Sequence, residues 1–401
     1  MFNEQEKSMR VLISSVGTRG DVQPAVALAL EVGRLGHEVR MCVPPNFTDR
    51  VTSLGFEATP VGIEMRAPRA GAGLAAPAVI PDLITDQFDA IGSAADGCDL
   101  ILGGGAHQYA ARSIAELRGI PCVIAVYAPA SLPSPDLAPP GQPAESEGVE
   151  ANLRMWDDTR RSWNDRSLKR VNANRARLGL APVNDVLDHI LTDRPWLAAD
   201  TTLGPSPSTP GMHVVQTGAW ILPDSNGLAP ELEAFINDGE PPVYLGFGSM
   251  PAAEGASRTL IDAARANGRR VILSQGWADL RPVDSAPDCI MVGDVNHHAL
   301  FPRVATVVHH GGAGTMTAAA RAGVAQVAVP MFGDQFYWGR RIRDLGIGSA
   351  VPFAGLSADA LTSALREALE PPVAARASSV ARSVTPDGAV VAARRLVEEH
   401  G

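Results

Sequence analysis

Short apolar runs alternate with amphipathic helical stretches along most of the sequence, and this alternation constrains the fold more than any other feature. In the first half, the apolar run at 11–15 (VLISS) precedes a helical stretch at 24–35, which ends at Gly36. Glycine is common there because the residue after a helix often takes a left-handed backbone conformation. Strands that alternate with helices in this way form a parallel sheet covered by helices. We therefore predict an α/β domain in the first half.

The same alternation restarts after a segment rich in proline, serine and glycine at 203–230. The new series begins with an apolar run at 243–247 and continues to 326–330. A chain of 401 residues is also too long for one compact core. We predict two α/β domains with these boundaries: a first domain at 1–205, a linker at 206–229, a second domain at 230–385 and a closing helix at 386–401.

The composition excludes several classes of protein. The chain has 34 Lys and Arg residues against 44 Asp and Glu residues, and its net charge of −10 provides no general field for a nucleic-acid backbone. The apolar runs are too short to span a membrane, and the polar opening at 1–8 differs from a secretory signal. The 4 cysteines are scattered without a C-x-x-C pair, so we expect a cytoplasmic protein without a zinc site or a disulfide framework.

The segment at 17–24 (GTRGDVQP) follows the first predicted strand and leads into a helix. In doubly wound sheets, ligands bind beyond the carboxyl ends of the strands, and a helix N-terminus there carries about half a positive charge. Two glycines permit a tight turn that holds Arg19 and Asp21 at this edge. Asp21 is therefore a candidate catalytic residue. The alternative is that it only caps the helix expected to start at Pro24.

A glycine-rich segment at 309–315 (HHGGAGT) lies at the same edge of the second predicted sheet. Its glycines allow backbone amides to approach a phosphate, and the helix that follows favours an anion. His309 is expected to donate a hydrogen bond to a diphosphate oxygen, although the sequence does not separate it from His310. The alternative is a turn that only permits close packing of helix and strand, to which two histidines would add nothing.

Five further positions follow predicted strands of the second half. Asp334 and Gln335 offer acceptors and donors that suit neighbouring sugar hydroxyls, although such a pair is more often found at the start of a helix. Ser249 ends the first strand of this half and is expected to reach a phosphate. Val295 is expected to pair with a nucleobase through its backbone, and Trp277 to lie either near the base or in the core.

In combination, these segments resemble the GT-B nucleotide-sugar glycosyltransferases. The likeness covers nearly the whole chain and rests on GTRGDVQP at 17–24, VYLGFGSM at 243–250, RRVILSQGWADL at 269–280, HHGGAGT at 309–315 and FGDQ at 332–335. Within that family, TDRPWLAAD at 192–200 and QTGAWILPD at 216–224 resemble actinobacterial enzymes that glycosylate vancomycin-type glycopeptide aglycones. GTRGDVQP and FGDQ also occur in sterol glucosyltransferases and in mycobacterial glycolipid glycosyltransferases.

The resemblance implies two Rossmann-like domains that face each other across a cleft, with the last helix packed back on the first domain. The first domain would bind the acceptor and the second a UDP- or dTDP-sugar, in a monomer or weak dimer. The resemblance also implies inversion at the anomeric carbon without a metal or another cofactor. Protein groups would instead neutralise the leaving diphosphate: His309 or His310, Ser249, Thr315, the amides of Gly312, Ala313 and Gly314, and Thr18 and Arg19 from across the cleft.

Asp21 is the favoured general base, because the similar glycopeptide and sterol enzymes have Asp where many plant and macrolide glycosyltransferases have His. An Asp with an ordinary pKa of about 3.9 is a weak base for an alcohol. It can still accept the proton late, as the hydroxyl attacks an oxocarbenium-like centre. Asp334 is the competing base, and otherwise holds donor hydroxyls together with Gln335. The segments at 65–81 and 129–150 are expected to rim the acceptor pocket.

Two interpretations from other classes fit parts of the pattern. A nucleotide-sugar 2-epimerase shares the GT-B architecture but would not need long acceptor loops. A non-catalytic nucleotide-sugar-binding protein would be expected to lack Asp21 or the diphosphate segment, and both are present. We therefore predict transfer of a sugar to a hydroxyl of a secondary metabolite, with a sterol or glycolipid as the alternative acceptor.

Overall fold

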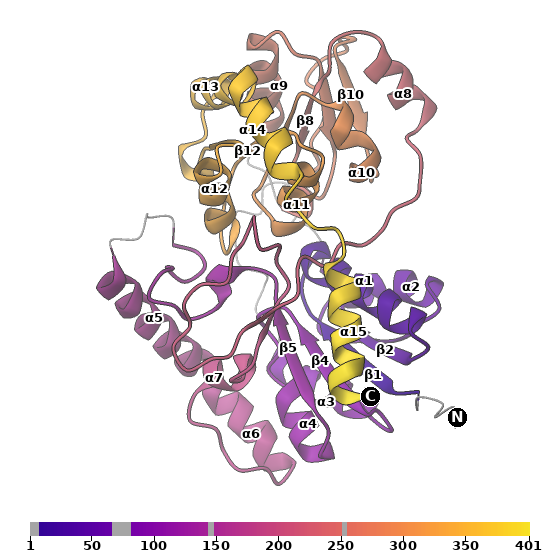
Figure 1. Ribbon diagram of the computed structural model, residues 1–401, viewed down its shortest axis with the longest axis vertical. Coiled ribbons are helices and arrows are strands. Elements are labelled where there is room, and N and C mark those ends of the chain that lie inside the picture. The colour runs from indigo at the N-terminus through magenta and orange to yellow at the C-terminus, as the bar shows by residue number, and fades with distance from the viewer. Residues whose placement is uncertain (1–7, 66–81, 143–147, 251–254) are drawn as a thin grey trace.

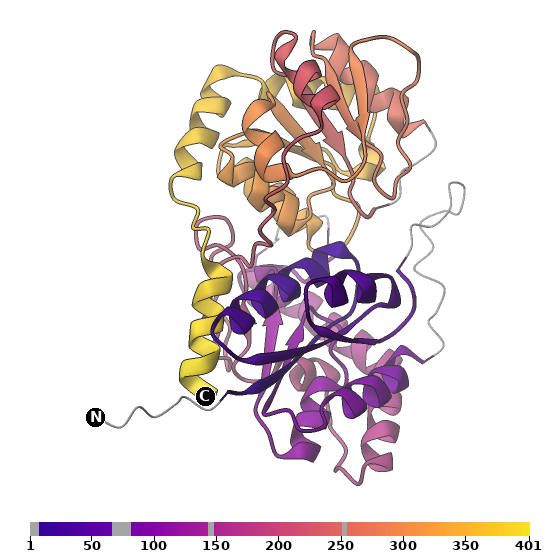
Figure 2. The ribbon, with the colours of Figure 1, turned by 90° about the vertical axis from the view of Figure 1, so that its right-hand side faces the viewer.

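The computed structural model describes residues 8–65, 82–142, 148–250 and 255–401. Figure 1 and Figure 2 show two α/β domains, one above the other, and each contains a parallel sheet with helices on both faces. The prediction of two Rossmann-like domains is therefore confirmed. Most of the segment at 65–81 and part of the segment at 129–150, both expected at the acceptor pocket, lie outside the described residues.

The N-terminal domain is built on a seven-stranded sheet in the order β3-β2-β1-β4-β5-β6-β7. Its strands are β1 (Arg10–Ser15), β2 (Glu38–Val43), β3 (Glu57–Pro60), β4 (Leu100–Gly104), β5 (Cys122–Val126), β6 (Trp196–Leu197) and β7 (Val215–Gln216). Its helices are α1 (Arg19–Arg34), α2 (Pro45–Ser53), α3 (Leu83–Ala94), α4 (Ala111–Arg118), α5 (Val149–Trp163), α6 (Lys169–Arg177) and α7 (Val186–Leu191). The register places Ser15 beside Gly104, so the loops after β1 and β4 are neighbours.

The C-terminal domain has a six-stranded sheet in the order β10-β9-β8-β11-β12-β13. Its strands are β8 (Val243–Gly246), β9 (Val271–Ser274), β10 (Cys289–Val292), β11 (Thr306–His309), β12 (Ala325–Ala328) and β13 (Gly348–Ala350). Its helices are α8 (Pro230–Asn237), α9 (Ala256–Ala266), α10 (His297–Leu300), α11 (Ala313–Arg321), α12 (Gln335–Asp344), α13 (Ala358–Ala368) and α14 (Pro371–Ala381). His309 pairs with Gly246 and Ala328, so the loops after β8, β11 and β12 share one edge.

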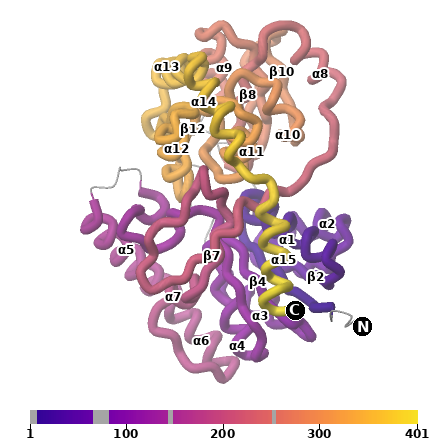
Figure 3. The backbone as a smooth tube through the Cα atoms, viewed as in Figure 1, coloured from indigo at the N-terminus to yellow at the C-terminus, as the bar shows by residue number. Residues whose placement is uncertain are grey.

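The chain passes between the two domains twice (Figure 3). The first connection leads from β7 to α8, and the second returns from α14 to α15 (Gly388–His400). Helix α15 lies along α1, and its apolar face joins the buried core of the N-terminal domain through Ala389, Ala392, Ala393 and Leu396. The first sheet also extends into the segment predicted as linker at 206–229. Strand β7 lies in that segment and pairs with β6, which precedes it. The segment between the sheets is correspondingly shorter.

Helix α1 begins at Arg19 and not at Pro24, where the sequence analysis started it. The Thr18 backbone N–H donates to Oδ2 of Asp21 at 2.8 Å, and the Thr18 side chain completes a capping box that starts the helix early. Pro24 is therefore inside the helix, where it deprives only the carbonyl of the exposed Gly20 of an intrahelical partner. The early start places Arg19 and Asp21 on the first turn of a regular helix.

Helix α12 of the C-terminal domain is fixed to the N-terminal domain on one side of the interface. Trp338 packs so closely on Gly204 that a Cβ there would lie 2.8 Å from the indole ring. Arg341 donates from Nε to the carbonyl of Leu203 at 2.9 Å and from its terminal nitrogen to that of Thr202 at 3.1 Å. These contacts belong to a buried apolar cluster that draws side chains from both domains. The N-terminus of α12 is thereby held at a set position against the N-terminal domain.

Candidate active site

The carboxylate of Asp21 has one oxygen bound to its own helix and one directed away from it. Oδ2 accepts the hydrogen bond from the Thr18 N–H, so the capping alternative describes part of its role. Gly17 has a φ of +142°, and a side chain there would collide with the Asp21 carboxylate. Oδ1 faces Gly105, just after β4, where a Cβ would lie 3.4 Å from it. Asp21 therefore presents one oxygen to the carboxyl edge of the N-terminal sheet.

Burial raises the pKa of Asp21 from its ordinary value to about 7. The hydrogen bond from Thr18 lowers the pKa, and the negative charge of Asp334 raises it. Burial also raises the pKa of Asp334, whereas the Trp338 indole N–H, which donates to its Oδ2 at 3.0 Å, lowers it. The charge of a carboxyl group in the other domain therefore contributes to the raised pKa of Asp21. A carboxylate with a pKa of about 7 accepts a proton more readily at neutral pH than an ordinary Asp does.

The two histidines that end β11 have different surroundings. His309 is fully buried; its Nε2 lies 3.0 Å from Oε1 of Gln326, and its Nδ1 accepts the N–H of Gly311 at 3.1 Å. Both ring nitrogens of His309 are therefore bonded inside the domain. The ring of His310 lies beside Gly248 and Gly312, and its buried Nδ1 has no hydrogen-bond partner. Of the pair, His310 is the one that has an unbonded ring nitrogen beside the glycine-rich loop.

The first turn of α11 provides backbone donors for an anion. Gly312 is its N-cap residue, and Ala313, Gly314 and Thr315 form the turn. The first N–H groups of a helix have no partner within it, and the helix dipole adds positive potential there. The turn after β8 is adjacent, because a Cβ on Gly248 would lie 3.3 Å from the His310 ring, and Ser249 follows directly. The two loops form a site with the donors that a diphosphate requires.

Asp334 and Gln335 are neighbours with different roles. The Gln335 side chain is 4% exposed; its Oε1 accepts the N–H of Met331 at 2.8 Å, and its amide contacts the Met250 sulfur at 3.3 Å. Gln335 therefore holds the loop between β12 and α12 together, and one of its two amide hydrogens is directed to the Met250 sulfur. Asp334, at the start of α12, keeps an oxygen that is not bonded to Trp338. Asp334 thus has a carboxylate oxygen available for a hydrogen bond.

Arg19 forms an ion pair across the interface. Its two terminal nitrogens donate to the two oxygens of Asp294, after β10, at 2.9 Å and 3.0 Å. The side chains are 38% and 73% exposed, so this pair lies at the open side of the interface. Val295 follows directly and packs partly on the core of the C-terminal domain. Arg19 is thus bound to Asp294 and not to the diphosphate loops.

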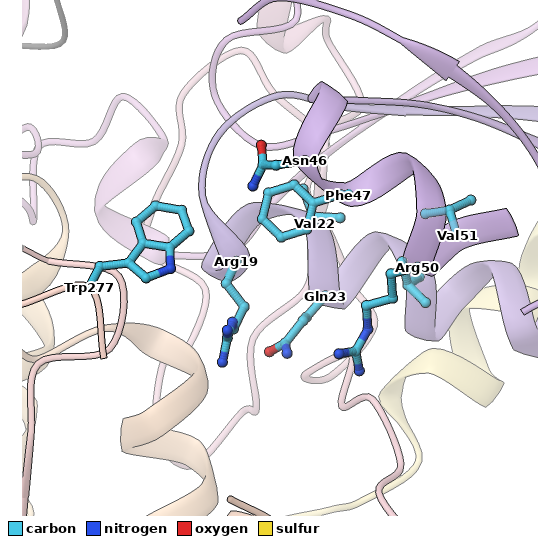
Figure 4. Close-up of a pocket in the computed structure, with 9 residues that line it drawn as sticks. Arg19, Val22, Gln23, Asn46, Phe47, Arg50, Val51 and Trp277 are labelled. Carbon is cyan, nitrogen blue, oxygen red and sulfur yellow. The ribbon is translucent and has the colours of Figure 1, made fainter. Parts of the chain in front are cut away.

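A pocket of about 270 Å³ lies beside this ion pair, between α1, α2 and Trp277 (Figure 4). The polar ends of Arg19, Gln23 and Arg50 point to the same side of it. Trp277 enters from the other domain, held by a hydrogen bond from its backbone N–H to the Gly248 carbonyl at 2.8 Å. The indole is therefore at the interface and not in the core of the C-terminal domain. The apolar lining consists of Val22, Val26, Phe47 and Val51.

Gln23, Phe47 and Arg50 line this pocket but were not predicted from the sequence. Arg19 and Gln23 are four positions apart and share a face of α1, but a helix started at Pro24 conceals this spacing. Arg50 and Phe47 lie on α2, and nothing in the sequence indicates that this helix faces α1 across a pocket. Such a contact depends on how the two helices pack.

Within the described ranges, no three His, Cys, Asp or Glu side chains are grouped so as to hold a metal ion. In the same part of the chain, no helix has the length and apolar character needed to cross a bilayer.

Comparison with known proteins gives consistent results for both halves of the chain. Residues 11–127 match the glycosyltransferase family 28 N-terminal domain, and residues 258–392 match the erythromycin biosynthesis protein CIII-like C-terminal domain. The vancomycin aglycone glucosyltransferase of Amycolatopsis orientalis is 46% identical over 398 residues, which is 97% of each chain. The dTDP-epi-vancosaminyltransferase of the same organism is 41% identical over 383 residues, 93% of each chain.

A solved structure extends the likeness to the whole fold. The crystal structure of the glycosyltransferase of kitacinnamycin aligns with a TM-score of 0.76 at 19% identity, and covers 98% of this chain and 100% of that chain. Its agreement with both domains and the high identity to the Amycolatopsis enzymes lead to one conclusion. The chain belongs to the GT-B glycosyltransferases, in the group that includes the vancomycin-type antibiotic enzymes.

Proposed function

We propose that the protein is an inverting enzyme that moves a sugar from a UDP- or dTDP-sugar to a hydroxyl of a glycopeptide-like aglycone, with Asp21 as general base. The observation that carries this proposal is the Asp21 carboxylate at the edge of the N-terminal sheet, whose pKa is raised to about 7 by burial and by the charge of Asp334 from the other domain. Gln335, the neighbour of Asp334, packs on Gly311, just before the first turn of α11, where we place the diphosphate. The names of the two relatives support the substrates, since one is a vancomycin aglycone glucosyltransferase and the other a dTDP-epi-vancosaminyltransferase.

The strand order of the C-terminal domain suggests in which order the nucleoside, diphosphate and sugar of the proposed donor lie along the sheet edge. Strands β10 and β9 lie at one end, β8 and β11 in the middle and β12 beyond them. The nucleoside would lie near Val295 and Trp277, the diphosphate at the first turn of α11, and the sugar at Asp334. On the N-terminal domain, the pocket beside Arg19 faces the nucleoside end, and Asp21 faces the sugar end.

In the proposed reaction, the oxygen of the acceptor hydroxyl forms a bond to the anomeric carbon while the bond from that carbon to the diphosphate oxygen breaks. The hydroxyl proton passes to Oδ1 of Asp21. The diphosphate leaves as an anion stabilised by the amides of Ala313 to Thr315, by Ser249 and by His310. Attack from the side opposite to the leaving group inverts the anomeric carbon. The proposal needs no metal because these donors and the helix dipole stabilise the departing charge.

A donor–acceptor screen tests the reaction. UDP-glucose and several dTDP-sugars are each combined with glycopeptide, polyketide and sterol acceptors, and the products are identified by mass spectrometry. We expect the mass of one sugar to be added to a glycopeptide aglycone. Transfer to a sterol alone would contradict the acceptor class, and formation of a C2-epimeric donor would indicate an epimerase. Tight nucleotide binding without any product would indicate a non-catalytic protein.

The base is tested by Asp21→Asn. This variant keeps the size of the side chain, and we expect kcat to fall roughly 10²- to 10⁴-fold while the Kd for dTDP or UDP stays within about twofold. Asp89→Asn, which changes an exposed carboxylate paired with Arg177, is the matched control. Asp334→Asn is expected to raise the KM of the donor sugar. Near-normal turnover by Asp21→Asn would show that the base has been assigned to the wrong residue.

A further inference from the structure

Tyr127 follows β5 and has a buried hydroxyl that the reaction proposed above does not use. The hydroxyl oxygen has no partner that meets hydrogen-bond geometry, and the side-chain hydroxyl that affects its pKa is that of Ser15. The ring is held edge-on against Trp220, with ring centroids 6.0 Å apart and an interplanar angle of 73°. Buried hydroxyls are normally hydrogen-bonded, so a partnerless one beside a functional group calls for an explanation.

Gly104, the last residue of β4, and Gly105, the residue after it, make room for this hydroxyl and for Asp21. A Cβ on Gly104 would collide with the Tyr127 oxygen. A Cβ on Gly105 would lie 3.4 Å from Oδ1 of Asp21 and 3.8 Å from Cε2 of the tyrosine ring. The carboxylate oxygen and the edge of the ring therefore both face Gly105, and the Tyr127 hydroxyl faces the adjacent Gly104.

The surroundings of Asp21 leave one of its carboxylate oxygens able to accept a hydrogen bond from a hydroxyl. Oδ2 of Asp21 is occupied by the Thr18 N–H, whereas Oδ1 faces Gly105 and the ring. Asp334, on α12, is the charged neighbour that disfavours ionisation of Asp21. Burial raises the pKa of Tyr127, and the charge of Asp21 raises it further while Ser15 opposes this. The phenol therefore stays protonated and can act only as a donor toward an ionised Asp21.

We propose that Tyr127 is a positioning residue for Asp21, whose hydroxyl donates a hydrogen bond to Oδ1 once the carboxylate ionises. This inference rests on the proposed function of Asp21 as the base. The hydrogen bond stabilises the ionised form, which is the form that accepts a proton. It also fixes the carboxylate, so that the remaining lone pair of Oδ1 points toward the acceptor hydroxyl.

The test is the pH profile of Tyr127→Phe, which removes one oxygen and keeps the ring. We expect the acidic limb of kcat/KM to move upward by about 0.5 to 1 pH unit, because loss of a donor raises the pKa of a carboxylate. At pH 7, kcat should fall about 2- to 6-fold, with the acceptor KM and the nucleotide Kd unchanged. Tyr109→Phe, in the same domain, is the matched control and should leave the limb in place.

An unmoved limb in Tyr127→Phe would overturn the proposal. A higher acceptor KM with an unmoved limb would also overturn it, because it would make Tyr127 part of the acceptor pocket. A readout that does not need activity separates this inference from the proposed function. Because the hydrogen bond forms only when Asp21 is ionised, Tyr127→Phe should lower the Tm more at pH 9 than at pH 5. In the Asp21→Asn background, Tyr127→Phe should lower the Tm equally at both pH values. If the difference persists in the Asp21→Asn background, the link between the two residues does not exist.

Discussion

At the level of single residues, adjacent side chains of one type differ because their surroundings differ. His309 is bonded on both ring nitrogens, and burial lowers its pKa to about 3. His310 lies beside the loop of α11, and burial lowers its pKa to about 4. Both rings are therefore neutral at pH 7. A neutral imidazole still carries one N–H, which is enough to bind a phosphate oxygen.

We therefore expect the two alanine variants to behave differently. His310→Ala should weaken binding of dTDP or UDP about tenfold, measured by isothermal titration calorimetry, with little change in Tm. His309→Ala should lower stability by about 2–4 kcal/mol, because it opens a cavity and leaves Gln326 and the Gly311 N–H without partners. Denaturant unfolding measures this cost. The reverse pattern would assign the diphosphate contact to His309.

The raised pKa of Asp21 predicts opposite effects of pH on activity and on stability. Activity requires the ionised form, so kcat/KM should fall as the pH drops below about 7. In the unfolded chain the same group ionises near its ordinary pKa, so between that value and about 7 the folded state binds more protons, and stability falls as the pH rises. The free energy of unfolding of Asp21→Asn should therefore rise relative to that of the wild type on going from pH 4 to pH 8, by roughly 3–4 kcal/mol. A constant difference in Tm across that range would contradict the buried ionisation.

At the level of elements, the strands and most helices could be predicted because apolar runs, periodicity and glycine ends coincide. The early start of α1 could not, since Pro24 is a stronger sequence signal than the Thr18–Asp21 capping box that actually begins the helix. The position of the glycine-rich loop at 309–315, between a strand and a helix at the sheet edge, could also be predicted. Which histidine faces that loop, and that Arg19 binds Asp294, depend on packing and on the meeting of two domains. No local pattern encodes such contacts.

Helix α12 links the interface to the candidate site, because Trp338 packs on Gly204 and donates to Asp334. Trp338→Phe removes the donor and leaves an aromatic ring, so we expect a loss of about 1 kcal/mol together with a higher KM for the donor sugar. Trp338→Ala should cost about 3–5 kcal/mol. Trp163→Phe, at the end of α5, is the control and should leave the KM of the donor sugar unchanged. Chemical denaturation and steady-state kinetics measure both effects; an unchanged donor KM in Trp338→Phe would mean that Asp334 does not depend on this bond.

At the level of the whole molecule, the two sides of the interface are built differently. On one side, α12 is bound into a buried cluster shared by both domains. On the other side, the exposed pair of Arg19 and Asp294 connects them. Exposed ion pairs contribute little stability and are screened by salt. The side with the pocket is therefore the one that separates at the lower energetic cost.

Asp294→Asn tests this asymmetry. The change frees Arg19 and removes a negative charge from the proposed nucleoside end, so the Kd for dTDP should decrease about two- to fivefold at low ionic strength. The effect should shrink at 0.5 M salt, and stability should change by less than about 1 kcal/mol. Asp284→Asn, in a pair with Arg265, is the control and should leave the Kd unchanged. Equal affinities of Asp294→Asn and wild type at every salt concentration would show that the pair does not restrain Arg19.

The return of α15 to the first domain also affects the order in which the chain is finished during translation. The sheet made by residues 10–216 leaves the ribosome early, whereas the helix that covers α1 with Ala392, Ala393 and Leu396 is synthesised only after the C-terminal domain. Until that helix emerges, an apolar face of the earlier half stays open to water and to other nascent polypeptides. The first domain is therefore completed only after the second has been made, and synthesis that stops before residue 388 leaves an apolar surface of the first domain uncovered.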